Sequence, residues 1–316
     1  MDFRESIKIN NRKTKLVVVS YIAIMLLVGL LADIAFRPLS NNGLLYDMQL
    51  YMTFAAIPYI TLGIMVCTLV GIFIISKFGH KMMLSGSHYR ELDSEGALSV
   101  QDKQLVNMVE EMAISANLGY LPRVFVMESA QMNAFAAGWN ANNALVAVTS
   151  GLLAKLTRSE VQAVIAHEIG HILHGDSKLT LYVGILANVI LTLTNILGRL
   201  FFFSRSRNNN ANKAKLILMV LNLVLPIITQ VLYLYLSRSR EYMADAAAVQ
   251  LTGDNQAMIS ALQKISGDYE VHTDNREEYE SFTEKYRAAA YIFSKGDSIF
   301  STHPTIDNRL KKLRGE

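Results

Sequence analysis

Cysteine is almost absent from this chain: Cys67 is the only one among 316 residues. A single cysteine cannot form an internal disulfide, so the fold does not depend on a disulfide framework. Cys67 lies within a long apolar run, where the expected role is that of a small, inert hydrophobic residue. The sequence therefore gives no sign of the disulfide-rich class of protein.

Charged residues are also scarce, at 18% of the chain, whereas hydrophobic residues make up 51%. Soluble domains carry about 25% charged residues, so this balance predicts long apolar stretches. The net charge of +3 is too small to indicate a nucleic-acid partner. Cys/His finger spacing and a basic face interleaved with aromatic residues are both missing from the sequence. We therefore expect a protein that binds a lipid bilayer and no nucleic acid.

The sequence contains four apolar runs that are each about 20 residues long. They are Leu16 to Phe36, Phe54 to Ile75, Leu179 to Gly198 and Leu216 to Leu236. A helix of this length spans the roughly 30 Å hydrocarbon core of a bilayer. Helices are expected because backbone exposed to lipid must satisfy its own hydrogen bonds. The first run is longer than the apolar part of an ordinary signal peptide, which favours an uncleaved anchor.

Basic residues flanking the first two runs indicate their orientation. The short connection between the runs, residues 37–53, carries only Arg37. The outer flanks are richer in basic residues, namely Arg4, Lys8, Arg12, Lys13 and Lys15 before the first run and Lys77, Lys81 and Arg90 after the second. Because cytoplasmic flanks carry the excess of Lys and Arg, the first two helices are predicted to form a hairpin with both ends in the cytoplasm.

The third and fourth runs allow two interpretations. Their connection contains Arg205, Arg207, Lys213 and Lys215 and no acidic residue. If both runs span the membrane, this basic loop lies on the outer side, against the usual tendency. The pair can instead form a hairpin that dips into the membrane or packs on the catalytic domain. Either way the chain crosses the membrane an even number of times between residues 179 and 236.

Soluble patterns fill the rest of the chain. Ser99 and Asp102 have capping-box spacing before a helical repeat of apolar residues, and Thr157 and Glu160 open a second helix that runs to about residue 173. Residues 124–127 and 144–149 are short and rich in β-branched residues, which predicts strands, with a turn-rich segment at 138–143. The predicted fold is α+β and mainly helical, with a small sheet and about four membrane helices. We expect an N-terminal membrane hairpin at 1–80, a catalytic domain at 81–178 and 237–316, and a second hydrophobic pair at 179–236.

The sequence His167-Glu168-Ile169-Gly170-His171 lies on the helix predicted after Thr157. It is an H-E-x-x-H motif, and its spacing places both imidazoles on one helix face, about one turn apart. Two nitrogens placed in this way can bind one Zn²⁺ at about 2.0–2.1 Å. Glu168 is then suited to accept the proton of the attacking water. The motif also occurs by chance, but here the helix is capped and its first turns are apolar.

A catalytic zinc site needs a third protein ligand. His174 lies about 10 Å along the helix axis from His167, at 1.5 Å per residue, so one ion cannot bind both. Glu241 begins the helix after the fourth run, and Asp245 shares its face at i, i+4. Glu241 is predicted as the third ligand, with Asp245 accepting the outer N–H of a ligating histidine. The alternative is a solvated carboxylate pair beside nearby arginines.

At this point the sequence resembles the membrane-bound zinc proteases of the HtpX heat-shock type, which are distant relatives of the CAAX prenyl proteases. The resemblance covers nearly the whole chain. Besides the histidine motif it rests on four segments, which are Asn133-Ala134-Phe135-Ala136, residues 148–153, Arg240-Glu241-Tyr242 with Ala244-Asp245, and Ser301-Thr302-His303-Pro304. It implies a zincin-like domain that binds one Zn²⁺ per chain and a multi-pass protein of the cell inner membrane.

The resemblance also implies the reaction and three further site residues. The reaction is endoproteolysis of misfolded or damaged membrane proteins at the cytoplasmic face, in quality control under stress. Asn133 is similar to a family asparagine near the substrate backbone. His303 and Arg309 resemble a cleft pair that steadies the substrate or the tetrahedral oxyanion, which makes His303 a catalytic candidate and Arg309 a substrate-binding one. At His174-Gly175-Asp176 the chain departs from the polar run expected of the family.

Two other classes of protein compete with a protease. A membrane scaffold that keeps zinc for structure alone has no use for Glu168. A metal transporter predicts ionisable residues inside the apolar runs, where Asp33 is the only acid. A protease accounts for both features. The protein or peptide substrate is expected to bind as an extended strand against a sheet edge, supplied by residues 144–149 or by the Asn133 segment.

Overall fold

The structure is a computed structural model of the whole chain. It describes all residues except 1–2, 41, 83, 85–87, 94–97, 139, 177, 180–181, 183–188, 190–191, 193–194, 197–198, 200–207 and 273–303. The chain divides into two compact units. The first comprises Met1–Lys13, Phe78–Leu181 and Tyr233–Glu316, and the second comprises Thr14–Lys77 and Tyr182–Leu232. A hydrophobic segment of the sequence therefore separates two parts of the first unit.

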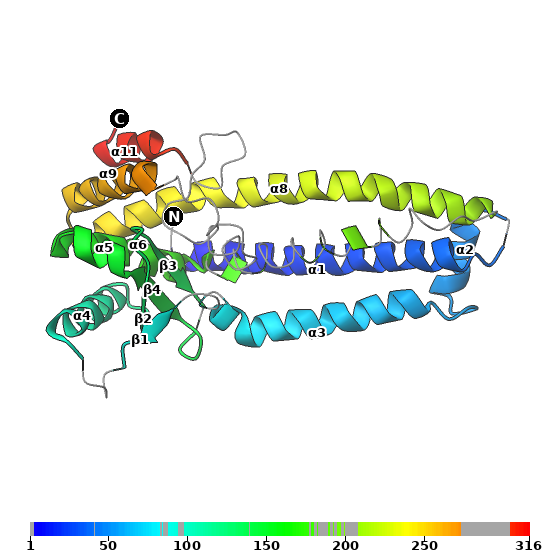
Figure 1. The fold of residues 1–316 in the computed structure, drawn as a ribbon, viewed down its shortest axis with the longest axis horizontal. Helices are drawn as coiled ribbons and strands as arrows, with labels where there is room; N and C mark the ends of the chain where they lie inside the picture. The colour runs from blue at the N-terminus through cyan, green and yellow to red at the C-terminus, as the bar shows by residue number, and fades with distance from the viewer. Residues whose placement is uncertain are drawn as a thin grey trace. The chain divides into compact units, whose positions relative to one another are not determined.

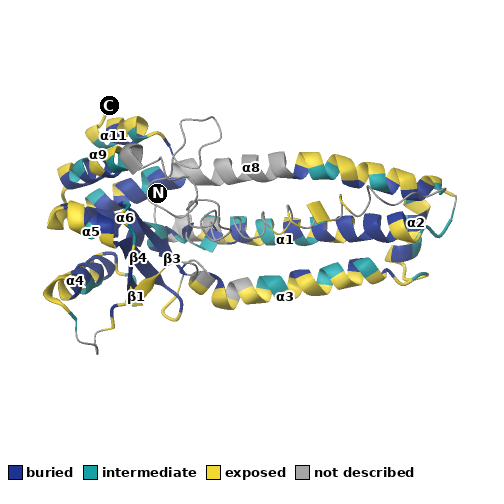
Figure 2. Ribbon diagram, in the orientation of Figure 1, coloured by how far each residue is buried: buried dark blue, intermediate teal, exposed yellow. Residues whose placement is uncertain are grey.

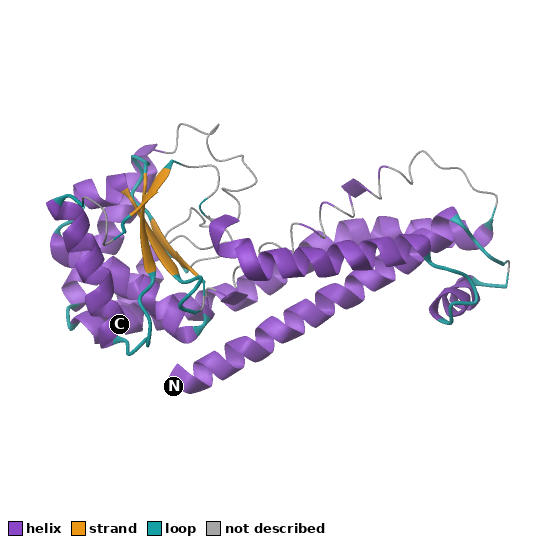
Figure 3. Cartoon of the chain, turned by 90° about the horizontal axis from the view of Figure 1, so that it is seen from below, coloured by secondary structure: helices purple, strands orange, loops and turns teal. Residues whose placement is uncertain are grey.

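The first unit contains one small mixed sheet (Figure 3). Its strands are β1 (Tyr89–Glu91), β2 (Arg123–Met127), β3 (Ala134–Ala137) and β4 (Leu145–Thr149), in the order β1-β2-β4-β3. Strands β2 and β4 are parallel, and the other two pairs are antiparallel. The predicted strands at 124–127 and 144–149 are present as β2 and β4. Strands β1 and β3 were not predicted, because neither contains a β-branched residue.

Strand β3 lies at one edge of this sheet and is connected to β4 by the predicted turn. Gly138 is required there, since its φ is +88° and a Cβ would lie 2.0 Å from the carbonyl oxygen of Asn143. All four residues of β3 are buried. The pairing register joins Ala134 to Val148 and Ala137 to Leu145. One backbone edge of β3 thus has no neighbouring strand among the described strands.

Helix α6 (Arg158–His174) is the central helix of the first unit. It packs against β3 and β4 on one side and against α4 (Val100–Ser115) and α9 (Asn255–His272) on the others (Figure 1). Residues 163–170 are all buried, because the helix is surrounded by the sheet and by other helices. Among the described residues, the other helices wholly within this unit are α5 (Ser150–Lys155) and α11 (Ile306–Arg314). Their apolar faces join one hydrophobic core with the sheet.

Both predicted capping boxes are present. The side chain of Ser99 and the backbone of Asp102 pair at the start of α4, and Thr157 and Glu160 pair at the start of α6. Each box satisfies backbone N–H groups that have no partner within the helix. The local sequence therefore sets where these two helices begin.

The second unit is helical among its described residues. It contains α2 (Leu44–Met52) and parts of α1 (Phe3–Phe36), α3 (Tyr59–Met82) and α8 (Asn209–Thr252). Asp33, the acid at the end of the first apolar run, is buried and caps α3. Its carboxylate accepts hydrogen bonds from the backbone N–H groups of Ile60 at 3.1 Å and Thr61 at 2.8 Å, and from the Thr61 hydroxyl at 2.6 Å. A negative charge at a helix N-terminus is favourable, so this acid has a structural role.

The membrane prediction is supported in part. Among the described residues, one helix is long and apolar enough to cross a membrane, at Asn11–Phe36, and a shorter apolar helix occupies Tyr59–Ile74. Helix α3 exposes large apolar side chains along its length (Figure 2), namely Leu62, Val66, Leu69, Val70 and Phe73. The third run lies largely outside the described residues, and the fourth is helical within α8. The described residues thus support a membrane helix and leave four-helix anchoring a prediction.

Glu160 offers a test of how α6 and α9 are joined. Its buried carboxylate accepts hydrogen bonds from the Thr157 N–H at 2.7 Å, the Ser260 hydroxyl at 2.6 Å and the Lys264 ammonium at 2.9 Å. Burial raises its pKa, but the Lys264, Ser260 and Thr157 contacts outweigh burial and lower the pKa to about 2. A lowered pKa in the folded state stabilises the fold above the unfolded pKa, and that stability is lost as the pH falls toward 2.

We expect Glu160→Ala to lower the free energy of unfolding by about 1–3 kcal/mol at pH 7, because it removes a cap and leaves polar partners unsatisfied. The measurement is thermal unfolding of the purified protein in detergent, with Glu111→Ala at an exposed position as the control. The difference from wild type should shrink between pH 4.5 and pH 2, as the wild-type carboxyl takes up a proton. A pH-independent difference would contradict this account.

Candidate metal centre

Helix α6 presents His167 and His171 on one face, as their spacing predicted. Their ring centroids are 4.8 Å apart and the ring planes are nearly perpendicular, at 89°. His167 is fully buried and the His171 side chain is 14% exposed. The helix ends directly after this face, because Gly175 adopts a left-handed conformation with φ of +72°. Both imidazoles are therefore held on a buried, capped helix.

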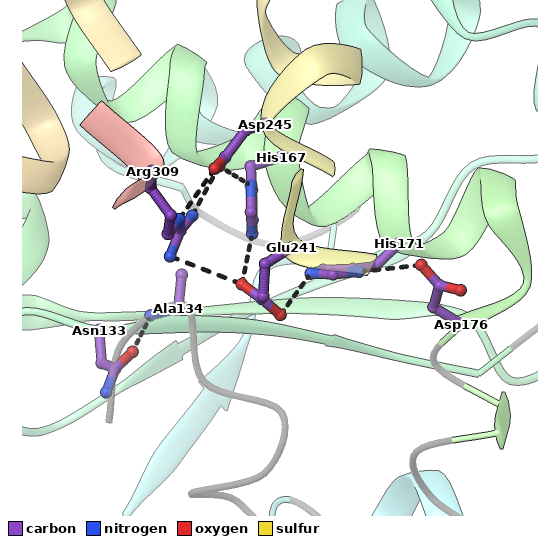
Figure 4. Close-up of polar contacts among 8 residues, drawn as sticks. All are labelled: Asn133, Ala134, His167, His171, Asp176, Glu241, Asp245 and Arg309. Atoms are coloured by element: carbon purple, nitrogen blue, oxygen red, sulfur yellow. Dashed lines mark hydrogen bonds and ion pairs between the residues drawn. The ribbon is translucent and has the colours of Figure 1, made fainter. Parts of the chain in front are cut away.

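Glu241, on helix α8, supplies a carboxylate to the same point (Figure 4). One carboxylate oxygen lies 3.7 Å from His167 Nε2, and the other lies 3.6 Å from His171 Nε2. Both distances are too long for a hydrogen bond. They are close to the roughly 3.3 Å that separates two ligands of a tetrahedral zinc ion. The three ligand atoms lie within 4.8 Å of one another, so the residues present fit one zinc ion.

The close approach of α6 and α8 depends on small residues. A Cβ added to Gly170 would lie 2.9 Å from Ala247 Cβ and 3.4 Å from Ala244 Cα. Gly170 stands between Glu168 and His171 in the motif, and the two alanines follow Glu241 on α8. The absence of a side chain at Gly170 thus permits the helix spacing at which Glu241 reaches the histidines.

Each ligand histidine has a carboxylate on its outer nitrogen. Asp245 Oδ1 lies 3.0 Å from His167 Nδ1, as predicted for this residue, and Asp176 Oδ2 lies 3.3 Å from His171 Nδ1. A carboxylate on Nδ1 fixes the tautomer and orientation that leave Nε2 free to bind metal. Asp176 was missed in the sequence because it lies beyond the end of α6. The signal that could have identified it is the Gly175 that turns the chain back toward His171.

Glu168 lies between His167 and His171 in the sequence, and its carboxylate is fully buried. Burial raises its pKa, and the imidazoles of His167 and His171 act in the opposite direction. A raised pKa makes a carboxylate a stronger base than an exposed one. His174 is also buried, and burial lowers its pKa. It does not belong to the described group of metal-ligand candidates, in agreement with the helix geometry.

Arg309, from α11, lies among these carboxylates (Figure 4). Its guanidinium is fully buried and binds both oxygens of Asp245. Burial raises the pKa of Asp245, but Arg309 and His167 outweigh burial and lower it. Burial likewise lowers the pKa of His167, but the nearby carboxylates of Asp245 and Glu241 raise it to about 9 in the absence of metal. The metal must therefore compete with a proton at His167.

Of the remaining predicted site residues, the structure describes Asn133 but not His303. Asn133 is buried at the start of β3, where its side-chain oxygen accepts the Ala134 N–H at 3.0 Å and its own N–H donates to Thr149 Oγ1 at 2.9 Å. His303 falls within the residues that the structure does not describe. The substrate-binding roles of Asn133 and Arg309 and the catalytic role of His303 therefore stay predictions.

An H-E-x-x-H helix that faces a glutamate on a second helix defines the class of metallopeptidases. The profile of Peptidase family M48 matches residues 99–316. The chain belongs to this family and is a metallopeptidase of the HtpX type. As this class is a membrane one, the apolar helix Asn11–Phe36 agrees with the assignment.

Individual relatives support the assignment over nearly the whole chain. The chain is 42% identical to "Protease HtpX homolog" of Helicobacter pylori strain J99, covering 99% of this chain and 98% of that protein. It is 37% identical to "Protease HtpX homolog" of Listeria innocua, covering 98% of each. Among solved structures, S. mikatae Ste24p matches with a TM-score of 0.47 at 19% identity, covering 85% of this chain and 62% of that one.

Removal of the third ligand tests the metal centre directly. Glu241→Ala should lower the zinc content of the purified protein well below one per chain, because two histidines alone bind zinc weakly. His167→Ala should have the same effect. Elemental analysis after dialysis measures the content, and Glu128→Ala, which removes an exposed carboxylate, should leave it unchanged. Full zinc content in Glu241→Ala would mean that another residue is the third ligand.

Gly170 permits a test that leaves every ligand in place. Gly170→Ala should weaken zinc binding, because the added methyl group forces α6 and α8 apart at Ala247. Gly267→Ala on α9 is the matched control, since a Cβ there meets nothing within 4 Å and the helix gains up to about 1 kcal/mol. Zinc affinity is measured by competition with a chromophoric chelator. Equal affinity in the two variants would show that the helix spacing does not limit binding.

Proposed function

We propose that this metallopeptidase is a membrane-integrated zinc endopeptidase that cleaves misfolded or damaged membrane proteins at the cytoplasmic face. The observation that carries the chemistry is the convergence of His167, His171 and Glu241 on one point, with Glu168 buried beside it. Metal-assisted peptide hydrolysis needs a Lewis acid and a base at the same carbonyl, and this cluster supplies residues for both.

The mechanism assigns a separate task to each residue. His167, His171 and Glu241 would hold Zn²⁺, and the bound ion would supply a Lewis acid for the scissile carbonyl and the attacking water. Glu168 accepts the proton of that water and later passes it to the leaving amine. Asp245 and Asp176 keep the two imidazoles in the orientation that metal binding requires. Burial of Glu168 raises its pKa because it disfavours the charged form, and this makes the carboxylate a stronger base than an exposed one.

The substrate is proposed to bind as an extended strand along β3. This strand is at the edge of the described sheet and packs against α6, which carries the histidines. Main-chain hydrogen bonds along an edge strand select little for sequence, which suits clearance of misfolded proteins. Asn133 at the start of β3 is proposed to contact the substrate backbone. His303 is proposed, from the family resemblance, to steady the substrate or the oxyanion. The buried contacts of Arg309 with Asp245 and Glu241 favour a different role for that residue.

The cytoplasmic orientation rests on charge and connectivity. Basic residues flank the first apolar pair on its outer sides, which favours a hairpin with both ends in the cytoplasm. The ligands on α6 and α8 belong to one compact unit, so the chain between them crosses the membrane an even number of times or not at all. A multi-pass protein of the inner membrane with a cytoplasmic active site satisfies both conditions.

Glu168→Gln tests the proposed reaction. The variant should keep its zinc and lose proteolysis by several orders of magnitude, because the amide cannot accept a proton. The assay is cleavage of casein and of a destabilised membrane protein in detergent, with zinc added and with zinc removed by a chelator. Glu128→Gln, which alters an exposed glutamate, should cleave at the wild-type rate. Near wild-type cleavage by Glu168→Gln would mean that another group is the base.

A further inference from the structure

Arg309 makes an unusually complete contact with the outer carboxylate of the site. Its Nε donates to one oxygen of Asp245 at 2.8 Å, and its Nη2 donates to the other at 2.6 Å. The same Asp245 oxygen that binds Nη2 lies 3.0 Å from His167 Nδ1. A planar guanidinium that binds both oxygens fixes the plane of the carboxylate. The orientation of Asp245 toward His167 is therefore set from the opposite side by Arg309.

Arg309 also reaches the ligand carboxylate. Its Nη1 lies 3.5 Å from Glu241 Oε2, and that oxygen lies 3.7 Å from His167 Nε2. One guanidinium thus contacts both the residue that orients His167 and the residue that would share its metal ion (Figure 4). The spacing between the two carboxylates is constrained by the fixed geometry of the guanidinium, which a lysine cannot provide.

The charges of the buried groups show why a cation is needed at this position. Glu168, Glu241 and Asp245 are three carboxylates with at most 3% exposure each, and Arg309 is a fully buried cation among them. Arg309 contacts two of these carboxylates, Asp245 and Glu241. Without it, these two buried carboxylates would repel each other strongly in a low dielectric. Arg309 therefore compensates negative charge beside the proposed metal ligands.

Helix α11, the last helix of the chain, is attached firmly enough to position Arg309. Leu310 is buried in the core of the first unit, and the Asn255 side chain at the start of α9 donates to the Leu313 carbonyl at 2.6 Å. The Lys312 ammonium lies 4.2 Å from the ring centre of Tyr242, the residue after Glu241. The helix is thus held against both α9 and the metal-binding segment of α8.

We propose that Arg309 is a positioning residue of the metal centre, which makes zinc affinity depend on the C-terminal helix α11. It acts by fixing Asp245 and Glu241 and so the orientation of His167. This inference rests on the proposed zinc site and adds to it a residue that touches no metal. Groups that orient metal ligands typically change metal affinity by about 10–100-fold when removed.

The test compares zinc affinity in full-length variants purified in detergent, by competition with a chromophoric chelator. Arg309→Gln should bind zinc at least about tenfold more weakly than wild type. Arg309→Lys keeps the charge and loses the planar contact, so its zinc affinity should lie between those of wild type and Arg309→Gln. Lys311→Gln is the matched control, because it removes one positive charge from an exposed position on the same helix. Its zinc affinity should equal that of wild type.

A double variant separates a role through Asp245 from a general loss of structure. If Arg309 acts through Asp245, the loss in Asp245→Asn with Arg309→Gln should be smaller than the product of the two single losses. A combined loss equal to the product of the two single losses would overturn the proposal. So would a folded Arg309→Gln with wild-type zinc affinity and a raised KM, which would make Arg309 a substrate contact instead.

Two further outcomes keep the proposals distinct. If Arg309→Gln does not fold, Arg309→Lys decides, and wild-type zinc affinity in that variant would overturn the positioning role. If the wild-type protein itself binds no zinc, both the proposed function and this inference fail. If the wild-type protein binds zinc and the Arg309 variants bind it with the same affinity, only this inference fails.

Discussion

The contact between helices α6 and α8 is the constraint on which the whole site depends. The two histidines of the candidate metal site lie on α6 and its glutamate lies on α8, so neither helix could hold the metal alone. Their distance is set where Gly170 meets Ala244 and Ala247. Interiors are closely packed, so one additional methyl group there is felt at the metal ligands. The geometry of the site thus depends on the small residues between the two helices rather than on the ligand residues themselves.

Burial creates the second requirement of the site, which is compensation of charge. Glu168, Glu241 and Asp245 are almost completely buried, and buried charges are tolerated only when they are paired or bind a metal. The imidazoles, Arg309 and a divalent ion together meet this requirement. The same burial raises the pKa of Glu168, the proposed general base. The groups that stabilise the site therefore lie beside the residue to which the proposed mechanism assigns proton transfer.

The two units of the chain differ in which side chains they bury and which they expose. In the first unit, a mixed sheet and helices enclose apolar residues away from water. In the second, α3 exposes large apolar side chains, while the acid Asp33 is buried and satisfied at a helix N-terminus. This reversal is expected where lipid replaces water, since polar groups then need internal partners. It agrees with a membrane metallopeptidase of the M48 family.

Much of the site was determined by the sequence itself. Helix spacing put His167 and His171 on one face, capping boxes set where α4 and α6 begin, and the i, i+4 relation tied Asp245 to Glu241. Strands β2 and β4 followed from their β-branched residues. Each of these depends on interactions within a few residues, which the order of side chains already contains.

Only the tertiary structure decided the rest. Strands β1 and β3 form because neighbouring strands pair with them, and Asp176 contacts His171 because the chain turns at Gly175. Arg309 reaches Asp245, 64 positions earlier in the sequence, through the packing of α11 on α9. Contacts between distant segments depend on how whole helices pack, and no local pattern in the sequence encodes that packing.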